Sequence, residues 1–174
     1  MNLVLRPFED RDAEAFANAV NESLDTLLPW MSWAHENYMP EDALKWFHYT
    51  HLQRQQELAD ESGIFSANGE LLGGVGIRYS DRCNAKPALG YWVRSSKQRK
   101  GIASEAVRRL AAEGFKKPDT KMIEILVAEN NVASRTVATR VGAKLIDIRF
   151  GLIVLASGPI NTAIYHLHRP HQMA

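Results

Sequence analysis

The segment KMIEILVA, residues 121–128, constrains the fold of this chain more than any other stretch. It is short and mostly apolar, and a helix-like segment lies on each side of it. Such an apolar run is typical of a strand that is buried on both faces of a sheet. Helices that precede and follow a strand pack on the faces of its sheet. The chain is therefore expected to have an α/β fold in which residues 121–128 form a central strand.

Hydrophobic periodicity predicts six further strands and about four helices. The strand patterns cover residues 2–8, 63–67, 71–79, 87–93, 144–156 and 162–169, and the helical patterns cover residues 13–24, 41–58, 101–115 and 132–141. Asn68-Gly69 predicts a type I′ turn between the second and third strands. The segment SGPIN, residues 157–161, predicts the turn between the last two strands. This order of elements indicates a mixed sheet with helices on its faces.

The composition is that of a globular protein without a strong overall charge. Hydrophobic residues make up 45% of the 174 residues and charged residues 24%. The 21 Lys and Arg nearly balance the 20 Asp and Glu, so no overall field favours nucleic acid or a membrane surface. No apolar run reaches the roughly 20 residues of a membrane span, and the N-terminus lacks a signal-peptide pattern. A cytoplasmic protein is expected.

No internal repeat, low-complexity tract or linker interrupts the pattern. Residues 1–170 are therefore expected to form a single domain, with residues 171–174 as a C-terminal tail. Cys83 is the only cysteine in the sequence, which excludes an intrachain disulfide.

A loop rich in hydrogen-bond donors, QRKGIA at residues 98–103, lies between a strand pattern and a helix pattern. The first N–H groups of a helix have no partner inside the helix, and the helix dipole adds positive charge there. A phosphate group satisfies both demands. Gly101 lets the backbone approach an anion closely, and Ala103 is small enough to leave room for it. The loop matches neither the Walker A pattern nor the dinucleotide fingerprint, so the residues alone leave open a phosphate site or a solvated basic loop.

The pattern Q-x-x-G-x-A, which opens a helix directly after the strand segment LGYWV, resembles the acetyl-CoA signature of the GCN5-related N-acetyltransferases, the GNAT family. The segment ENNVASRTVATRVGA, residues 129–143, is similar to a second signature of that family. The segments LLGGVGIRY and ALGYWV and the early Trp-rich stretch look like its branch of Rim-type ribosomal-protein N-terminal acetyltransferases. The resemblance implies a mixed, mostly antiparallel seven-stranded sheet, splayed between its fourth and fifth strands, with about four helices on its faces.

The resemblance also implies acetyl-CoA as the cosubstrate, without a metal or a covalent intermediate on the protein. The backbone of the loop and of the first helical turn would hold the pyrophosphate of acetyl-CoA, at Gln98, Arg99, Lys100, Gly101, Ile102, Ala103 and Ser104. The fourth and fifth strands would part to admit the pantetheine arm. A free N–H near Trp92 or Val93 would polarise the thioester carbonyl, which is a form of oxyanion stabilisation. Cys83 is expected to be a spare thiol rather than a nucleophile.

By the same resemblance, Ser134 is the acid that protonates the departing thiolate, and Asn131 contacts the pantetheine arm. From the residues alone, Asn131 could instead cap a helix and Ser134 could be a polar residue of its first turn. The base is less defined, because Ala88 lies near the position where many relatives carry a glutamate. Asp147 is the candidate base, although it lies one residue past the matching position and would face the wrong side unless a bulge intervenes. Glu124 and proton transfer through water are the alternatives.

Trp30 and Trp33, which lie between two prolines, are expected to line the acceptor groove, with core packing as the second interpretation. The scattered acids Glu36, Asp60 and Glu61 could attract a cationic acceptor, but such groups usually lie on the surface. His166 and His168 lack further ligands nearby in the sequence, so no metal site is expected.

The sequence thus predicts an enzyme that moves the acetyl group of acetyl-CoA directly to an amine. The favoured acceptor is the N-terminal α-amine of a protein such as a ribosomal protein. Two alternatives stay open: an acetyltransferase for a small amine (a polyamine, an aminoglycoside or an amino-acid derivative) and a non-catalytic acyl-CoA-binding sensor. Nucleic acid and membranes are not expected partners, and a homodimer is left open.

Overall fold

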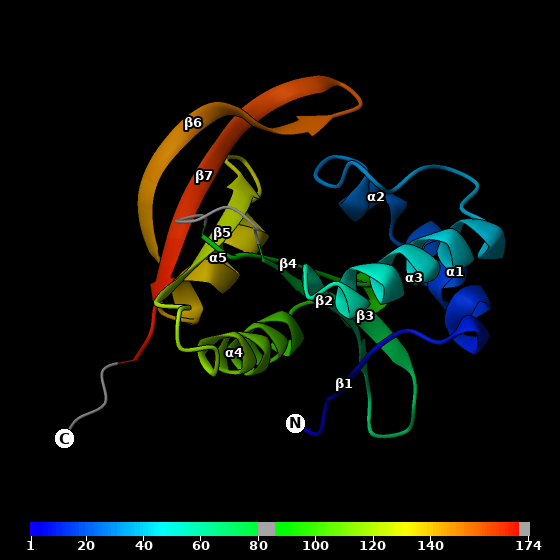
Figure 1. The fold of residues 1–174 in the computed structure, drawn as a ribbon. Coiled ribbons are helices and arrows are strands. Elements are labelled where there is room, and N and C mark those ends of the chain that lie inside the picture. Colours follow the sequence, from blue (N-terminus) through cyan, green and yellow to red (C-terminus); the bar gives the residue numbers. More distant parts are fainter. Residues whose placement is uncertain (80–85, 171–174) are drawn as a thin grey trace.

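The computed structural model describes residues 1–79 and 86–170, which form a seven-stranded sheet with helices on both faces (Figure 1). The strands are β1 Val4–Arg6, β2 Ala59–Phe65, β3 Leu71–Arg78, β4 Ala88–Val93, β5 Met122–Ala128, β6 Lys144–Leu155 and β7 Gly158–His168. They lie in the order β1-β2-β3-β4-β5-β7-β6, and all neighbours are antiparallel except β4 and β5. The predicted mixed sheet is confirmed. Cys83 and the predicted tail lie outside the described residues.

The described residues contain five α-helices, one more than the four whose patterns were predicted. They are α1 Ala13–Glu22, α2 Leu24–Leu27, α3 Pro40–Gln55, α4 Ile102–Phe115 and α5 Val132–Arg140. The additional helix, α2, is a single turn and too short to leave a periodic pattern. Within the part of the chain that the structure describes, none of these helices combines the length and the apolar character needed to cross a membrane.

Each face of the sheet carries its own apolar core. On one face, α4 packs through Val107 and Leu110 against strand residues such as Ile125. On the other face, α1 and α3 pack through Phe16 and Phe47. Figure 1 shows these two groups of helices on opposite sides of the strands. Because side chains alternate along a strand, each strand residue belongs to one of these two layers.

The contact between β4 and β5 is restricted to two residue pairs, Ala88 with Glu124 and Leu89 with Ile125. Beyond Leu89, β4 continues to Val93 and stays paired with β3. β5 meanwhile pairs along its whole length with β7 on its other side. The two parallel strands therefore diverge after Leu89, which confirms the predicted splay between the fourth and fifth strands.

The hairpin between β2 and β3 is present, but its turn is not the predicted type I′. That turn needs positive φ at both central residues, whereas Gly69 has a φ of +87° and Asn68 does not have a positive φ. The N–H of Gly69 donates to the carbonyl of Ser66 at 3.0 Å, so Ala67 and Asn68 are the central residues. This is a type I turn followed by a glycine in the left-handed region.

The predicted turn SGPIN, residues 157–161, is wrong, because the observed turn between β6 and β7 is shorter. Leu155 pairs with Gly158, so Ala156 and Ser157 alone connect the strands, and Pro159 lies inside β7. The pairing of β7 with β5 does not extend to this end of β7. Pro159 is tolerated because one edge of the strand is free there.

Gly73→Ala is expected to lower the free energy of unfolding by about 1–3 kcal/mol. An added Cβ would collide with the carbonyl oxygen of Trp92 and lie 2.9 Å from the Cα of Val93, so the backbone would have to move. The matched control is Gly90→Ala on β4, where a Cβ meets nothing within 4 Å and the change should stay within about 0.5 kcal/mol. Urea unfolding followed by circular dichroism measures both variants. Equal stabilities would contradict the close approach of β3 to β4.

Candidate active site

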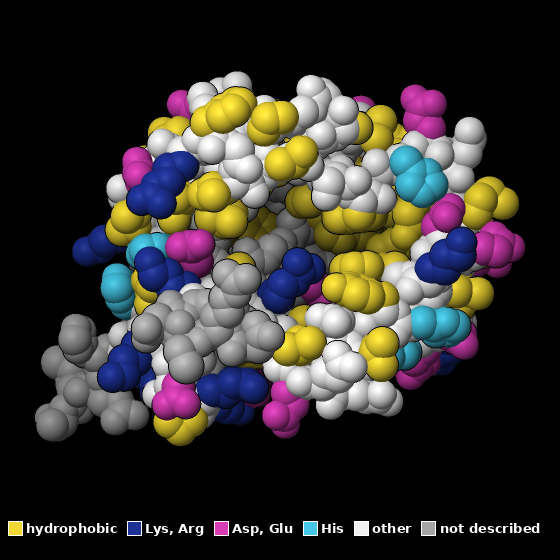
Figure 2. All heavy atoms as spheres, turned by 45° about the horizontal axis from the view of Figure 1, so that its top comes forward, with side chains coloured by type: hydrophobic (Ala, Val, Ile, Leu, Met, Phe, Trp, Pro, Cys, Tyr) yellow, Lys and Arg dark blue, Asp and Glu magenta, His cyan; other side chains and the backbone are white. Residues whose placement is uncertain are grey.

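A cavity of about 330 Å³ lies on the face of the sheet that carries α1 and α3, beside the point where β4 and β5 diverge. Strands β2, β3, β4 and β5 line it on one side, and residues 30–33, Trp46 and Ile153 line it on the other. Figure 2 shows hydrophobic side chains gathered around a hollow in this part of the surface. The cavity also reaches Asn131 and Ser134 at the start of α5. It therefore extends into the gap between the two strands.

Glycines form the floor of this cavity. Gly76 pairs with Gly90, and Gly74 pairs with Trp92; opposed residues of antiparallel strands point to the same face. A Cβ at Gly74 would lie 2.6 Å from Nε1 of Trp92, and a Cβ at Gly76 would collide with the carboxylate of Glu61. Above Gly90 nothing lies within 4 Å. The side chains of Trp92 and Glu61 therefore lie over bare backbone, and the space above Gly90 stays open.

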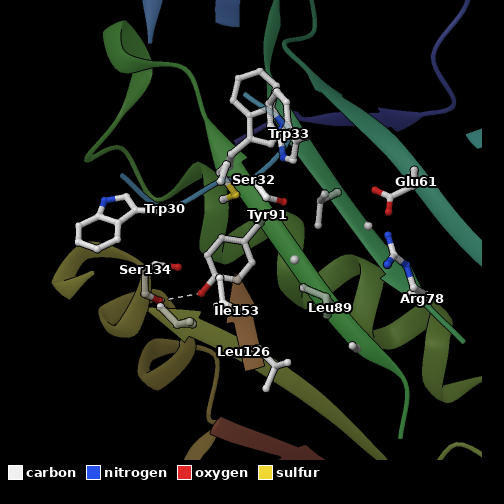
Figure 3. Close-up of a pocket in the computed structure, with 18 of the residues that line it drawn as sticks. Trp30, Ser32, Trp33, Glu61, Arg78, Leu89, Tyr91, Leu126, Ser134 and Ile153 are labelled. Atoms are coloured by element: carbon white, nitrogen blue, oxygen red, sulfur yellow. Dashed lines mark hydrogen bonds between the residues drawn. The ribbon is translucent and has the colours of Figure 1, made fainter. Parts of the chain in front are cut away.

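The predicted acceptor-groove residues, Trp30 and Trp33, both line the cavity. The Trp33 ring lies 5.6 Å from the Trp92 ring, so it also takes part in the aromatic packing below α1. In Figure 3, Trp30 lies on the side of Ser134, apart from Trp33. Trp46 is half-buried, packs against the core on this face and lines the cavity as well. Two indoles thus stand where the resemblance expects the acceptor, and their contact with it stays a prediction.

Ser134 and Asn131 occupy the first turn and the cap of α5. The side-chain oxygen of Asn131 accepts a hydrogen bond from the N–H of Ser134 at 3.2 Å, so the capping interpretation of Asn131 is confirmed. The Tyr91 hydroxyl donates to the Ser134 carbonyl at 2.7 Å (Figure 3). Burial raises the pKa of Tyr91 to about 12, so this hydroxyl keeps its proton. Both α5 residues line the cavity, and their chemical roles stay predictions.

The loop that follows β4 is fastened to α1. The Arg94 guanidinium donates two hydrogen bonds to the Glu22 carboxylate, each at 2.9 Å. The N–H of Ser95 donates to the Ser23 hydroxyl at 2.9 Å. The hydrogen bond from Arg94, with help from Ser96, lowers the pKa of Glu22 to about 2. A charged pair between distant segments therefore positions this loop.

The same loop presents backbone amides at the N-terminus of α4. The first hydrogen bond of that helix runs from the N–H of Glu105 to the carbonyl of Gly101, at 3.1 Å, so the N–H groups of residues 102–104 have no partner inside the helix. Arg99 and Gly101 have left-handed φ angles of +63° and +77°. Such alternation between conformations forms concave nests of N–H groups that bind anions. The geometry suits a phosphate at this helix terminus.

The side chains of the predicted loop contacts fall into two groups. Arg99 and Lys100 are exposed and could pair with an anion, whereas Ile102 and Ser104 are buried and offer a ligand only their backbone. The side-chain amide of Gln98 donates to the carbonyl of Val93 at 3.1 Å, which ties the loop to the end of β4. Ala103 is half-buried and packs against the core on the face that carries α4.

One backbone N–H of β4 points into the gap between the strands. The carbonyl of Trp92 points toward β3, because a Cβ on Gly73 would collide with it. The N–H of Arg94 also points toward β3, since it donates to Leu72 at 2.8 Å. Successive N–H groups of a strand point to opposite sides, so the N–H of Val93 points away from β3. Of the two predicted oxyanion positions, Val93 rather than Trp92 has its N–H directed into the gap.

The candidate base Asp147 lies outside the cavity lining. The register of β6 shifts at Ile146, so Asp147 pairs with Ile164 and shares its face of the sheet; a bulge is therefore present, as that candidate required. The Asp147 carboxylate is exposed and accepts a hydrogen bond from Arg149 at 2.9 Å. This hydrogen bond lowers the pKa of Asp147, which is the opposite of what a base near neutral pH needs.

The alternative base, Glu124, is also outside the lining. Its carboxylate lies 3.0 Å from Nε2 of His166. Ala88, which stands near the position of a glutamate in many relatives, does line the cavity. Across residues 1–79 and 86–170, no group of three or more His, Cys, Asp or Glu side chains could hold a metal ion.

Two charged residues of the cavity were missed or misjudged from the sequence: Arg78 and Glu61. They lie together at the end away from Trp30 (Figure 3). Burial raises the pKa of Glu61, although the charges of Arg78 and Arg54 act against the increase. The sequence suggested that Glu61 lies on the surface. Its burial depends on Gly76 in the neighbouring strand, which leaves room for the carboxylate. The signal was the two-residue spacing of Gly74 and Gly76, which places both on one face.

Comparison with known proteins agrees with this geometry. A family model described as acetyltransferase (GNAT) domain matches residues 2–144. A Bacillus subtilis (strain 168) protein, provisionally named ribosomal N-acetyltransferase YdaF, is 29% identical over 144 residues, which are 81% of this chain and 77% of that protein. A Vibrio cholerae structure, provisionally described as a ribosomal-protein-serine acetyltransferase, has a TM-score of 0.82 at 25% identity and covers 97% of this chain and 95% of its own.

A second solved structure shares the fold at lower identity. The microcin C7 self-immunity acetyltransferase MccE, in complex with acetyl-CoA and AMP, has a TM-score of 0.88 at 22% identity. The match covers 96% of this chain and 92% of that one. At this identity the similarity concerns the fold alone.

Glu22→Gln is expected to remove an acid-sensitive part of the stability. The pKa of Glu22 is lowered to about 2 in the folded protein, from an ordinary value of 4.5, so its ion pair stabilises fully above pH 4.5 and is lost as the pH falls toward about 2. The variant should be less stable by about 1 kcal/mol at neutral pH, a small figure because the pair is partly solvated. Its melting temperature should also fall less steeply below pH 4.5.

The control is Glu113→Gln, which breaks a pair with Lys116 whose side chains are 64% and 72% exposed. This variant should follow the wild-type curve of melting temperature against pH. Identical curves for all three proteins would show that the contact between Arg94 and Glu22 does not stabilise the fold.

Proposed function

The chain belongs to the GNAT acetyltransferase family, and from that premise we propose that it transfers the acetyl group of acetyl-CoA to the N-terminal α-amine of a protein such as a ribosomal protein. The observation that carries this proposal is the cavity, which runs from the gap between β4 and β5 to a pocket lined by four indoles and a carboxylate. The names of the Bacillus and Vibrio relatives support the acceptor class.

The loop at residues 98–104 and the gap between the strands fit acetyl-CoA. The pyrophosphate would accept hydrogen bonds from the N–H groups at the start of α4, where Gly101 permits the left-handed backbone. The exposed Arg99 and Lys100 would add positive charge. The pantetheine arm would then pass between β4 and β5, and Asn131 and Ser134 lie beside that path.

The chemistry would be a direct transfer from sulfur to nitrogen. The N–H of Val93 would donate to the thioester oxygen and stabilise the negative charge that develops there. The amine nitrogen attacks the carbonyl carbon, the C–N bond forms, and the C–S bond breaks. The hydroxyl of Ser134 would give a proton to the leaving thiolate and recover one from the nitrogen.

A small amine is the second candidate acceptor, and the size of the cavity favours it. A volume of about 330 Å³ is at the lower end of the range for small-molecule sites. An N-terminal peptide would place its first residue in the cavity and the remainder outside. The two acceptor classes therefore differ in whether chain length beyond the first residue improves the reaction.

Gly101→Glu is expected to weaken acetyl-CoA binding by at least about 100-fold in Kd, or by about 2.7 kcal/mol. The change puts a negative charge and a side chain where the phosphate would approach the backbone. The matched control is Gly69→Glu, because Gly69 also has a positive φ, +87°, and has nothing within 4 Å of an added Cβ. Both variants carry the same backbone strain and the same charge. Isothermal titration calorimetry that finds equal affinities would remove the loop as the phosphate site.

The acceptor class is tested by thiol release from acetyl-CoA with three sets of amines. Peptides that begin with Ser or Ala should give turnover that increases with peptide length, whereas polyamines and aminoglycosides should give little. Turnover with a small amine but not with peptides would overturn the proposed acceptor in favour of the second candidate. Tight acetyl-CoA binding without thiol release from any of them would favour the sensor.

A further inference from the structure

We propose that Glu61 binds the ammonium form of the acceptor amine and takes a proton from it, as a catalytic residue of the acetyl transfer. This inference rests on the proposed function, because it assigns a role within that same site. Neither of the bases suggested by the sequence, Asp147 and Glu124, lines the cavity, whereas Glu61 does.

The position of Glu61 is set by the glycine floor. Glu61 lies on β2 and pairs with Gly76 on β3, which pairs in turn with Gly90 on β4. All three therefore point to the same face. Because Gly76 lacks a side chain, the Glu61 carboxylate lies over the backbone of β3. Its oxygens are thereby displaced from their own strand toward β4.

The open space above Gly90 separates this carboxylate from the reacting thioester. Neighbouring strands lie about 4.8 Å apart, so a carboxylate over β3 is about one strand spacing from the backbone of β4. Nothing lies within 4 Å of an ideal Cβ at Gly90, which leaves room there for an amine nitrogen. Val93 lies three residues further along β4, about 10 Å away, and its N–H points into the gap where the thioester would lie. An amine nitrogen between Gly90 and Val93 would thus stand between its base and its electrophile.

The charges around Glu61 leave its carboxylate available. Arg54 of α3 donates to the backbone carbonyl of Glu61 and to the carboxylate of Asp60, at 3.1 Å for the latter. Its two terminal nitrogens are therefore occupied by other acceptors, whereas its buried Nε has no hydrogen-bond partner among the described residues. Arg78 of β3 shares the cavity with Glu61. Among residues 1–79 and 86–170, no hydrogen bond or ion pair reaches the Glu61 carboxylate from a side chain.

The raised pKa of Glu61 favours an α-amine over a lysine side chain as the acceptor. Burial raises the pKa of Glu61, against the opposing charges of Arg78 and Arg54 and with a small contribution from Asp60. A terminal α-amine has an ordinary pKa of about 8, whereas a lysine side chain has one of about 10.4. The proton therefore moves over a smaller pKa difference from an α-amine to Glu61. This agrees with the N-terminal acceptor that the relatives suggest.

The step balances as follows. The ammonium gives one proton to the Glu61 carboxylate, and the neutral nitrogen attacks the thioester carbon. Collapse of the tetrahedral species releases the thiolate, which receives the second nitrogen proton by way of the Ser134 hydroxyl. The products are the acetylated amine and the CoA thiol, and Glu61 returns its proton to solvent.

The test compares Glu61→Gln with Asp60→Asn, which removes a neighbouring charge from the same strand at a position outside the cavity lining. The probe is a tripeptide amide with a free N-terminal serine. Thiol release is measured from about pH 6 to about pH 10, a range that includes the titration of an α-amine. Calorimetry measures acetyl-CoA binding and the binding of the tripeptide to the protein–CoA complex. The N-formyl tripeptide, which has no ammonium group, is the control ligand.

Glu61→Gln should lower kcat/KM by about 100-fold near neutral pH and leave the affinity for acetyl-CoA unchanged. The defect should shrink at high pH, because the amine is then already neutral and needs no base. Glu61→Asp should keep more activity than Glu61→Gln, and Asp60→Asn should stay within about twofold of wild type. A defect that is independent of pH, or a parallel loss of acetyl-CoA affinity, would overturn the proposal in favour of a structural role.

The same experiment separates this inference from the proposed function. If wild type turns over and Glu61→Gln turns over equally at neutral pH, the inference fails and the function stands. If wild type releases no thiol with any acceptor, the function fails and calorimetry decides the inference. The catalytic part of the inference then fails with the function. Tripeptide binding that Glu61→Gln loses and Asp60→Asn keeps would support ammonium binding by Glu61, and equal or absent binding would overturn that as well.

Discussion

The early divergence of β4 from β5 is the constraint on which the rest of this structure depends. Two parallel residue pairs hold the strands together, and beyond them the backbone of β4 up to Val93 has a free edge toward the gap. Free backbone groups inside a protein need partners. The Tyr91 hydroxyl, which bonds the Ser134 carbonyl, connects β4 to α5 across this region without closing it. The layer of α4 and α5 on the far face keeps the two halves of the sheet in one core.

The glycines of β3 and β4 convert this gap into a usable site. A strand face with ordinary side chains would be filled by them, since sheet layers pack about 10 Å apart. Here Gly74, Gly76 and Gly90 have no side chains to fill this face. The Trp92 side chain lies over Gly74, the Glu61 side chain lies over Gly76, and the space above Gly90 is open. The site is therefore carved into regular strands, which are more rigid supports than loops.

Much of the fold followed from local patterns, and the site followed less completely. The order of elements along the chain was predicted from hydrophobic periodicity, and the splay through the resemblance that the two signature segments around Gly101 and Asn131 carry. The hairpin turns were misjudged, because turn type depends on backbone angles at Asn68 and on the free edge beside Pro159. The burial of Glu61 in the cavity was not predicted for a further reason: it depends on side chains and glycines of three strands at once.

The hydrogen bonds between Arg94 and Glu22 bear on how such proteins can be recombined. The signature loop at residues 98–103 looks self-contained in the sequence, yet the residues just before it are held by residues more than seventy positions earlier. Arg94 donates to Glu22, and the N–H of Ser95 donates to Ser23. A chimera that exchanges the loop and α4 between two relatives would leave behind the residues of α1 that hold the loop in place. An exchange of the loop would therefore have to include α1 as well. The segments that depend on one another in this enzyme are thus interleaved along the chain rather than consecutive.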